Sequence, residues 1–386
     1  MSILSIMNKM ADKLVKRNNS FETYSTEKQR FFLENLKVPS DDIERSFNQY
    51  LCQMEMNGKL VTFLINIASL PLLICFYYKK NSIPESHEQK IDAVFFADGK
   101  PNNILPEQLA STVKQLRVVC NKKENLNDVD REFFRKICKK YPMSWHFLLK
   151  CLMKIRFYSY EIETYAPTMV VACNEYSFTS SVLTSYCELY GIKHVNVMHG
   201  EKLFYIRDAF FRFHECYVWD EYYADLFKRL KAEPTQFKVE LPKSMRFSEM
   251  KGEKKIDYTY YLGAESGKVL EEIIGCMIDL AKEGYYVAIR PHPRYTNLSE
   301  LKVKLEEIEL ENPLSMPIEE SILRTKNAIS TYSTVLNQAY HNGTKIVIDD
   351  ISKPELFKNL RSLEYIMLAK EHSLLSKLIQ RECKDK

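Results

Sequence analysis

The segment Arg-Pro-His-Pro-Arg, residues 290–294, places two guanidinium groups and an imidazole directly after an apolar run, Tyr285 to Ile289. The run has the composition of a buried strand, and in open α/β sheets ligands bind beyond the carboxyl ends of the strands. The two prolines fix φ and remove two backbone donors, so the segment cannot simply continue into a helix. Such donors on a stiff turn suit a phosphate or diphosphate. We therefore predict a phosphate site formed by Arg290, His292, Pro293 and Arg294; the alternative is a basic loop in water.

A second group of donors follows about 40 residues later, the spacing expected for one strand–helix–strand unit and a loop. Here Ser-Thr-Tyr-Ser-Thr, residues 330–334, precedes a helical segment, Val335 to Asn342. Hydroxyls and backbone N–H groups at the start of a helix, together with the helix dipole, form an anion site. The alternative is an ordinary N-cap, where serine and threonine are favoured. We predict that Ser330, Ser333 and Thr334 contact the same phosphate as the turn at 290–294.

Two weaker motifs fit the same site. The loop Gly-Ala-Glu-Ser-Gly, residues 263–267, follows a predicted strand and opens a helix, so Gly263 could let a ligand approach the backbone. Glu320 begins another predicted helix, where its carboxylate could accept hydrogen bonds from a ribose or simply favour the positive helix end.

Candidate bases lie in the first half of the chain. Met198-His199-Gly200-Glu201 stands at a predicted strand end, and a histidine titrating near neutral pH can remove a proton from an attacking hydroxyl. The alternative is a histidine that caps the strand by bonding to backbone. Glu201 and Glu175, the latter at the end of the neighbouring predicted strand, are further candidates for the base.

Alternating strands and helices must position these residues. The predicted strands are residues 91–97, 116–120, 168–173, 194–198, 216–219, 258–262, 285–289, 328–330 and 345–348. The predicted helices are one or two within 131–160, then 177–190, 221–230, 269–282, 298–310 and 335–342. Short links between them predict parallel sheets covered on both faces. The polar, basic segment 242–255 has no periodicity and is predicted to join two domains.

Composition limits the classes of protein. The chain has 386 residues, 45% hydrophobic and 27% charged, with a formal net charge of +4, which argues against a dedicated nucleic-acid binder. Its ten cysteines include no Cys-x-x-Cys pair, so we expect reduced thiols and no zinc site. The first 17 residues lack the apolar core of a secretory signal, and we predict a cytoplasmic protein.

One uncharged segment, Leu60 to Tyr78, complicates that prediction. It is flanked by Lys59 and by Lys79-Lys80 and just reaches the ~20 residues needed to span a bilayer. Three interpretations remain open: a buried or domain-capping helix, peripheral contact with the inner membrane surface, and a true span.

The second half of the chain resembles bacterial GT-B glycosyltransferases that use CMP- or CDP-activated donors, such as sialyltransferases and polysialyltransferases. The shared motifs are His292-Pro293 and the later pair Ser333-Thr334. The segment Ile329 to Ala339 is also similar to a stretch of teichoic-acid glycerophosphotransferases. The resemblance implies that His292, Ser333 and Thr334 contact the donor phosphate. The first half departs from the sialyltransferases, which place an acidic pair before a glycine; His199-Gly200 instead resembles the teichoic-acid enzymes, in which the histidine is the proposed base.

Together these features predict an α/β protein of the GT-B class, with two Rossmann-like domains facing a central cleft and an N-terminal helical extension. The predicted domains are residues 1–90 (helical), 91–245 (acceptor) and 256–386 (donor). The predicted activity is metal-independent transfer from a nucleotide sugar, CMP-linked favoured, to an oligosaccharide or lipid-linked glycan of a bacterial capsule, lipopolysaccharide or other surface polysaccharide, with no cofactor. The alternatives are a polyol-phosphate transferase using a CDP-linked donor, a nucleotide-sugar epimerase, and a non-catalytic subunit that binds sugar nucleotide.

Overall fold

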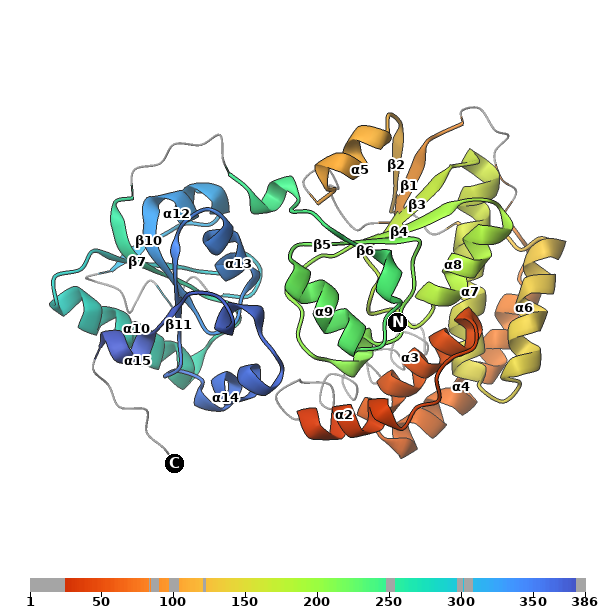
Figure 1. Cartoon of the computed structure of the whole chain (residues 1–386), viewed down its shortest axis with the longest axis horizontal. Helices are drawn as coiled ribbons and strands as arrows, with labels where there is room; N and C mark the ends of the chain where they lie inside the picture. Colours follow the sequence, from red (N-terminus) through yellow and green to blue (C-terminus); the bar gives the residue numbers. More distant parts are fainter. Residues whose placement is uncertain are drawn as a thin grey trace. The chain divides into compact units, whose positions relative to one another are not determined.

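The computed structural model describes residues 25–82, 84, 90–96, 104–120, 123–247, 254–296, 301 and 308–379. The chain divides into two compact units, which we describe separately. The first unit comprises Met1–His199 and Phe204–Leu241, and the second comprises Gly200–Leu203 and Pro242–Lys386. In Figure 1 the strands of each unit lie at its centre, with helices around them.

The first unit contains a six-stranded sheet in the order β2-β1-β3-β4-β5-β6, with every neighbouring pair parallel. Its strands are β1 (Ala93–Phe96), β2 (Leu116–Val119), β3 (Met169–Ala172), β4 (Lys193–Val197), β5 (Glu215–Val218) and β6 (Phe237–Val239). β1 and β3 are short apolar runs, and none of the side chains of β1, β3 and β4 is exposed, as expected where helices cover both faces of a parallel sheet. The carboxyl ends of the parallel strands therefore share one edge.

Eight helices of this unit fall within the described residues. They are α2 (Thr26–Glu34), α3 (Asp42–Asn57), α4 (Lys59–Tyr78), α5 (Glu107–Thr112), α6 (Asp128–Lys140), α7 (Trp145–Tyr165), α8 (Ser180–Leu189) and α9 (Glu221–Arg229). Several begin and end for local reasons. Asn127 and Asp130 form a reciprocal capping box at the start of α6, and Gly191 adopts a φ of 65° just beyond the end of α8, a left-handed conformation that glycine tolerates.

The N-terminal helices share the hydrophobic core of the first sheet. Tyr50 and Met54 of α3 belong to the same buried cluster as Phe147 and Ile155 of α7 and Val170 of β3. The predicted helical extension is therefore present, and the core that it completes belongs to the first α/β unit.

The second unit contains another parallel six-stranded sheet, in the order β12-β11-β10-β7-β8-β9. Its strands are β7 (Ile256–Tyr261), β8 (Val287–Arg290), β9 (Glu309–Leu310), β10 (Thr325–Ser330), β11 (Lys345–Ile348) and β12 (Ser373–Leu374). Its described helices of four or more residues are α10 (Gly267–Lys282), α12 (Ile318–Arg324), α13 (Thr334–His341), α14 (Pro354–Ser362) and α15 (Leu375–Leu378). One core cluster joins α10 to β7, β8, β10 and β11.

These observations confirm the predicted α/β class, with two Rossmann-like units that each contain a parallel six-stranded sheet and with helices ahead of the first strand. Each of the nine predicted strands is present. Three short edge strands, β6, β9 and β12, were not predicted because two or three residues show no periodicity. The predicted helix at 298–310 falls mostly outside the described residues, and its end is wrong, since Glu309–Leu310 form β9.

Candidate functional site

In the second unit, the loops that follow β7, β8 and β10 lie at one edge of the sheet. The register places Tyr261 of β7 beside Arg290 of β8, and Ser330 donates from its hydroxyl to the Tyr261 carbonyl at 3.1 Å. Thr296 then ties two of these loops together, because its hydroxyl donates to the Gly263 carbonyl at 3.0 Å and accepts from the His292 backbone N–H at 2.8 Å. The structure thus brings Gly263, His292 and Ser330 to the same edge.

The turn after β8 holds the His292 imidazole in a defined tautomer. The Arg294 backbone N–H donates to His292 Nδ1 at 3.1 Å, which leaves Nε2 as the protonated nitrogen of the neutral ring. Burial lowers the pKa of His292, the Arg294 guanidinium lowers it further, and Glu265 opposes the shift. The ring also stacks on Tyr295 at a centroid distance of 4.4 Å. His292 is therefore neutral near pH 7 and offers an Nε2–H donor, while Pro293 and Arg294 are exposed beside it.

Arg290 has a different role from the one predicted. Its guanidinium is buried, pairs with the fully buried Glu311 at 3.2 Å and donates to the Met316 carbonyl at 2.8 Å. Ser321 also donates to Glu311, at 2.5 Å. Through these contacts Arg290 holds the segment before α12 against β8. We therefore no longer include Arg290 among the predicted phosphate contacts.

The hydroxyl cluster after β10 forms the start of α13. Ser333 is the N-cap, its side chain accepts from the Val335 N–H at 3.2 Å, and Thr334 is the first helical residue. Tyr365, which is buried, donates to the Ser333 carbonyl at 3.4 Å. The N-cap, which was the alternative interpretation of this cluster, is therefore present, and Ser333 and Thr334 are partly exposed at the positive end of the helix. Ser330 is buried and serves to join β10 to β7.

The glycine loop and Glu320 complete this edge. Gly263 donates its backbone N–H to Glu265, whose other carboxylate oxygen accepts from Lys353 at 2.8 Å. Glu320 is exposed in the first turn of α12, a helix that runs back along the sheet to enter β10. The start of α12 therefore lies on the side of the strand carboxyl ends.

In the first unit, Glu175 and His199 form a pair at the ends of β3 and β4. His199 Nδ1 lies 3.7 Å from Glu175 Oε1, and the second oxygen of Glu175 accepts from Asn196 at 3.1 Å. Gln49 of α3 donates to the Glu175 carbonyl at 2.9 Å. Glu175 is fully buried, whereas about half of the His199 side chain is exposed. The buried carboxylate faces Nδ1, and a carboxylate at Nδ1 favours the neutral tautomer that is protonated there.

Glu201, the third predicted base, belongs to the second unit. Asn337 of α13 donates to Glu201 Oε2 at 3.3 Å. The chain passes from one unit to the other at Gly200, whose φ is 71°. Among the interactions described, Glu175 pairs with His199 and Glu201 accepts from Asn337.

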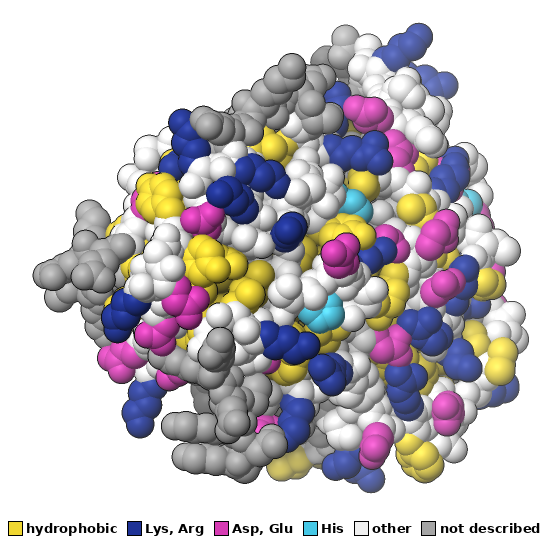
Figure 2. Space-filling view, turned by 60° about the vertical axis from the view of Figure 1, so that its left-hand side comes forward, with side chains coloured by type: hydrophobic (Ala, Val, Ile, Leu, Met, Phe, Trp, Pro, Cys, Tyr) yellow, Lys and Arg dark blue, Asp and Glu magenta, His cyan; other side chains and the backbone are white. Residues whose placement is uncertain are grey.

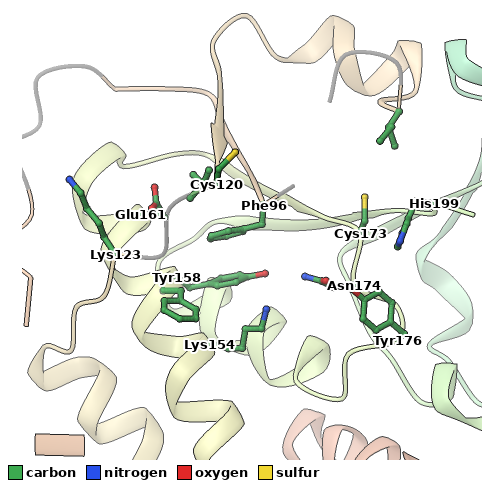
Figure 3. A pocket seen from close by; sticks show the side chains of 13 residues that line it. Phe96, Cys120, Lys123, Lys154, Tyr158, Glu161, Cys173, Asn174, Tyr176 and His199 are labelled. Atoms are coloured by element: carbon green, nitrogen blue, oxygen red, sulfur yellow. The ribbon is translucent and has the colours of Figure 1, made fainter. Parts of the chain in front are cut away.

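A cavity of about 360 Å³ opens beside His199 within the first unit (Figure 3). It lies at the carboxyl ends of β1, β2 and β3 and is floored by α7, which contributes Lys154, Tyr158 and Glu161. Lys123, in the segment after β2, also lines the cavity (Figure 3). A mixture of ammonium groups, a carboxyl group and aromatic rings suits a polar ligand with hydroxyls and a negative charge.

Glu161 contributes a carboxyl group to the lining of this cavity. Burial raises its pKa to about 7, although Arg117 and Lys123 oppose the shift. The carboxyl group can therefore donate or accept a hydrogen bond near neutral pH.

Sequence reasoning missed this cavity. Its signal was available in α7, where Lys154, Tyr158 and Glu161 follow one another at spacings of four and three residues and so lie on one face. The rest of the helix is rich in apolar and aromatic residues, so this polar stripe indicates a face that does not pack only in the hydrophobic core.

The charged side chains show no single-sign surface on the face drawn in Figure 2, where basic and acidic groups are intermixed. This distribution agrees with the small net charge of the chain.

Comparison with known proteins gives likenesses of structure only. No family model and no curated protein matches the chain. Among solved structures, the glycotransferase of kitacinnamycin is 7% identical with a TM-score of 0.42, covering 76% of this chain and 88% of that one. The wall teichoic acid polymerase TagF is 10% identical with a TM-score of 0.37, covering 84% and 89%. Anabaena HepE in complex with UDP is 10% identical with a TM-score of 0.38, covering 75% and 89%. All three TM-scores lie below 0.5, and we therefore argue function from the residues of this chain.

Proposed function

We propose that the protein is a glycosyltransferase that moves a sugar from a nucleotide-activated donor to a glycan acceptor of a bacterial surface polysaccharide. The observation that carries the proposal is the pairing of buried Glu175 with half-exposed His199, which lines a cavity that also contains Lys154 and Glu161. A carboxylate behind one imidazole nitrogen leaves the other to act as a general base. The phosphate-type donors at the edge of the second sheet provide an independent second observation.

On the acceptor side, His199 Nε2 takes the proton of an acceptor hydroxyl as its oxygen attacks the anomeric carbon. Glu175 stabilises the imidazolium that this transfer creates. The cavity lined by Lys123, Lys154 and Glu161 holds the neighbouring part of the acceptor, and its ammonium groups favour an acceptor that carries a carboxylate or phosphate.

On the donor side, the bond from the anomeric carbon to the phosphate oxygen breaks, and the nucleotide leaves with the electron pair. In this proposal the developing charge is stabilised by the His292 Nε2–H, the Arg294 guanidinium and the N-terminus of α13 with Ser333 and Thr334; the tautomer of His292 and the N-cap at Ser333 support these roles. Glu320 is proposed to bind the ribose, and Gly263 to allow close approach to the backbone. These groups supply the charge stabilisation without a metal ion in the proposed mechanism.

The test is nucleotide release from CMP-, CDP-, UDP- and GDP-sugars, with and without glycan acceptors that carry or lack an acidic group. We expect acceptor-dependent release with a CMP-sugar and a product that contains the transferred sugar. Conversion of the donor without release identifies an epimerase, and tight binding without turnover identifies a non-catalytic subunit; either result contradicts the proposal.

A polyol-phosphate transferase is the second candidate, and the His199-Gly200 motif favours it. In that reaction the acceptor oxygen attacks the β-phosphorus of a CDP-linked polyol, and CMP leaves. A new phosphodiester in the product, detected by ³¹P NMR, would identify this reaction instead of sugar transfer.

A further inference from the structure

Helix α4 presents a continuous apolar stripe to solvent. Of its 20 residues, those that are exposed recur at the spacing of one helix face and lack charge beyond the first residue. They are Leu60, Phe63, Leu64, Ile67, Pro71, Ile74, Cys75 and Tyr78. The mean hydropathy is 2.1, and only 6% of the most apolar window is buried. Of the interpretation as a buried or domain-capping helix, the buried form is therefore excluded, whereas the capping form agrees with the packing of Leu73, Phe76 and Tyr77 on the core cluster.

The opposite face of α4 is fixed to the first unit (Figure 1). Asn66 donates to the Met143 carbonyl at 2.9 Å and accepts from the His146 N–H at 3.1 Å. At the other end, the buried guanidinium of Arg156 donates to the Phe76 carbonyl at 3.1 Å. Leu73, Phe76 and Tyr77 pack on the core cluster of the unit. A helix held in this way cannot span a bilayer, because spanning would expose these polar contacts to lipid.

We infer that α4 lies in the plane of an anionic membrane surface, with its exposed stripe inserted among the lipids. At ~1.5 Å per residue the helix is ~30 Å long, and the whole length of the stripe is apolar. Lys59 at its start and Lys80 just after its end are exposed, so both ends carry ammonium groups that complement anionic headgroups. The neighbouring side chain of Met143 is also exposed and apolar. The occupant that these features fit is a lipid surface, since a protein partner would not require cations at both ends.

The first test is co-sedimentation of the full chain with two kinds of vesicle. One is phosphatidylcholine alone, and the other is phosphatidylcholine with about 30% phosphatidylglycerol, which makes the surface anionic. We expect binding to the anionic vesicles only. The double variant Phe63→Glu/Ile67→Glu should weaken binding to the anionic vesicles on the order of 100-fold, because two inserted side chains become charged. Lys59→Gln with Lys80→Gln should weaken it on the order of fivefold per lysine. The matched control is Val38→Glu with Leu314→Glu, which changes exposed apolar residues outside α4 and should leave binding unchanged.

A second measurement separates in-plane insertion from other arrangements. Fluorophores at Cys75 and at an introduced cysteine replacing Leu60, in a Cys120→Ser background, should be quenched at the same shallow depth by spin-labelled lipids. A depth difference across the helix indicates a span and overturns the proposal. Absence of vesicle binding also overturns the proposal. If the chain then forms a dimer in lipid-free solution that Phe63→Glu dissociates, the apolar stripe is assigned to contact with a second copy of the chain.

Discussion

The pairing of Glu175 with His199 leads to different expectations for the two residues. His199→Ala removes the base, and we expect kcat to fall about 10²–10⁴-fold with donor KM unchanged. Glu175→Gln keeps the Asn196 contact but loses the charge behind the imidazole, so kcat should fall less and its pH dependence should shift. Steady-state kinetics from pH 5 to 9 measure both effects. A wild-type kcat for His199→Ala would exclude the proposed base.

His292 is expected to act on the donor through one hydrogen bond. His292→Ala should raise donor KM about tenfold, the effect of a bond of ~1.4 kcal/mol, and should lower kcat as the leaving group loses a donor. His372→Ala is the matched control, because that half-buried histidine contacts only the Lys370 carbonyl among the hydrogen bonds described for it. Equal kinetics for the two variants would remove His292 from the site.

Glu161 should give the stability of the protein a specific pH dependence. Its pKa is raised from 4.5 to about 7, so the folded chain retains a proton that the unfolded chain releases between these values. Stability therefore falls as pH rises through this window, and the full cost is present above pH 7. Glu161→Gln removes that cost and should be more stable by on the order of 1–3 kcal/mol at pH 8, with little difference at pH 4.

Urea unfolding of both proteins at the two pH values measures this difference. Glu221→Gln, an exposed change in the first turn of α9, is the control and should show no such dependence. An identical effect of Glu161→Gln at both pH values would mean that the carboxyl group is not protonated in the folded state.

At the scale of elements, two ion pairs hold the same region of the second unit but differ in burial. Arg290–Glu311 joins β8 to the segment before α12 in the interior, whereas Arg324–Glu309 joins α12 to β9 near the surface. Arg290→Met leaves the Glu311 carboxylate buried without its cation and should destabilise the fold by ~3–5 kcal/mol. Arg324→Met should cost less than ~1 kcal/mol.

Thermal and urea unfolding measure both changes. Adding Glu311→Gln to Arg290→Met should recover part of the lost stability, because the uncompensated charge is removed. If Arg290 contacts the donor instead, Arg290→Met would lower donor affinity and leave stability near that of the wild type.

For the whole molecule, the assignment of one unit to the donor predicts where a nucleotide protects the backbone. CMP at saturation should slow amide exchange most at residues 263–267, 290–296 and 331–336, all in the second unit. The ends of β3 and β4 in the first unit should show the smaller effect. Strongest protection around Glu175 and His199 would reverse the assignment of the two units.

The fold could be predicted from the sequence because buried parallel strands such as Val94-Phe95 and Val170-Val171 are short apolar runs between turn signals. The strand-end motifs were found for the same reason, since a strand that stops at Arg290 or Val197 shows which residues follow it. The role of Arg290 could not be predicted, because Glu311 and Met316 reach it from another loop. Likewise, the pairing of His199 with Glu175 depends on the register of β3 with β4.

Helix α7 carries two features on different faces. Arg156 anchors the exposed helix α4, and Lys154 and Glu161 line the cavity beside His199. The distance between a bilayer in contact with α4 and that cavity would therefore be constant. If the proposed acceptor is built on a lipid, its end would have to cover this distance to reach the His199 imidazole, and the proposed transfer would then require an acceptor chain of a minimum length.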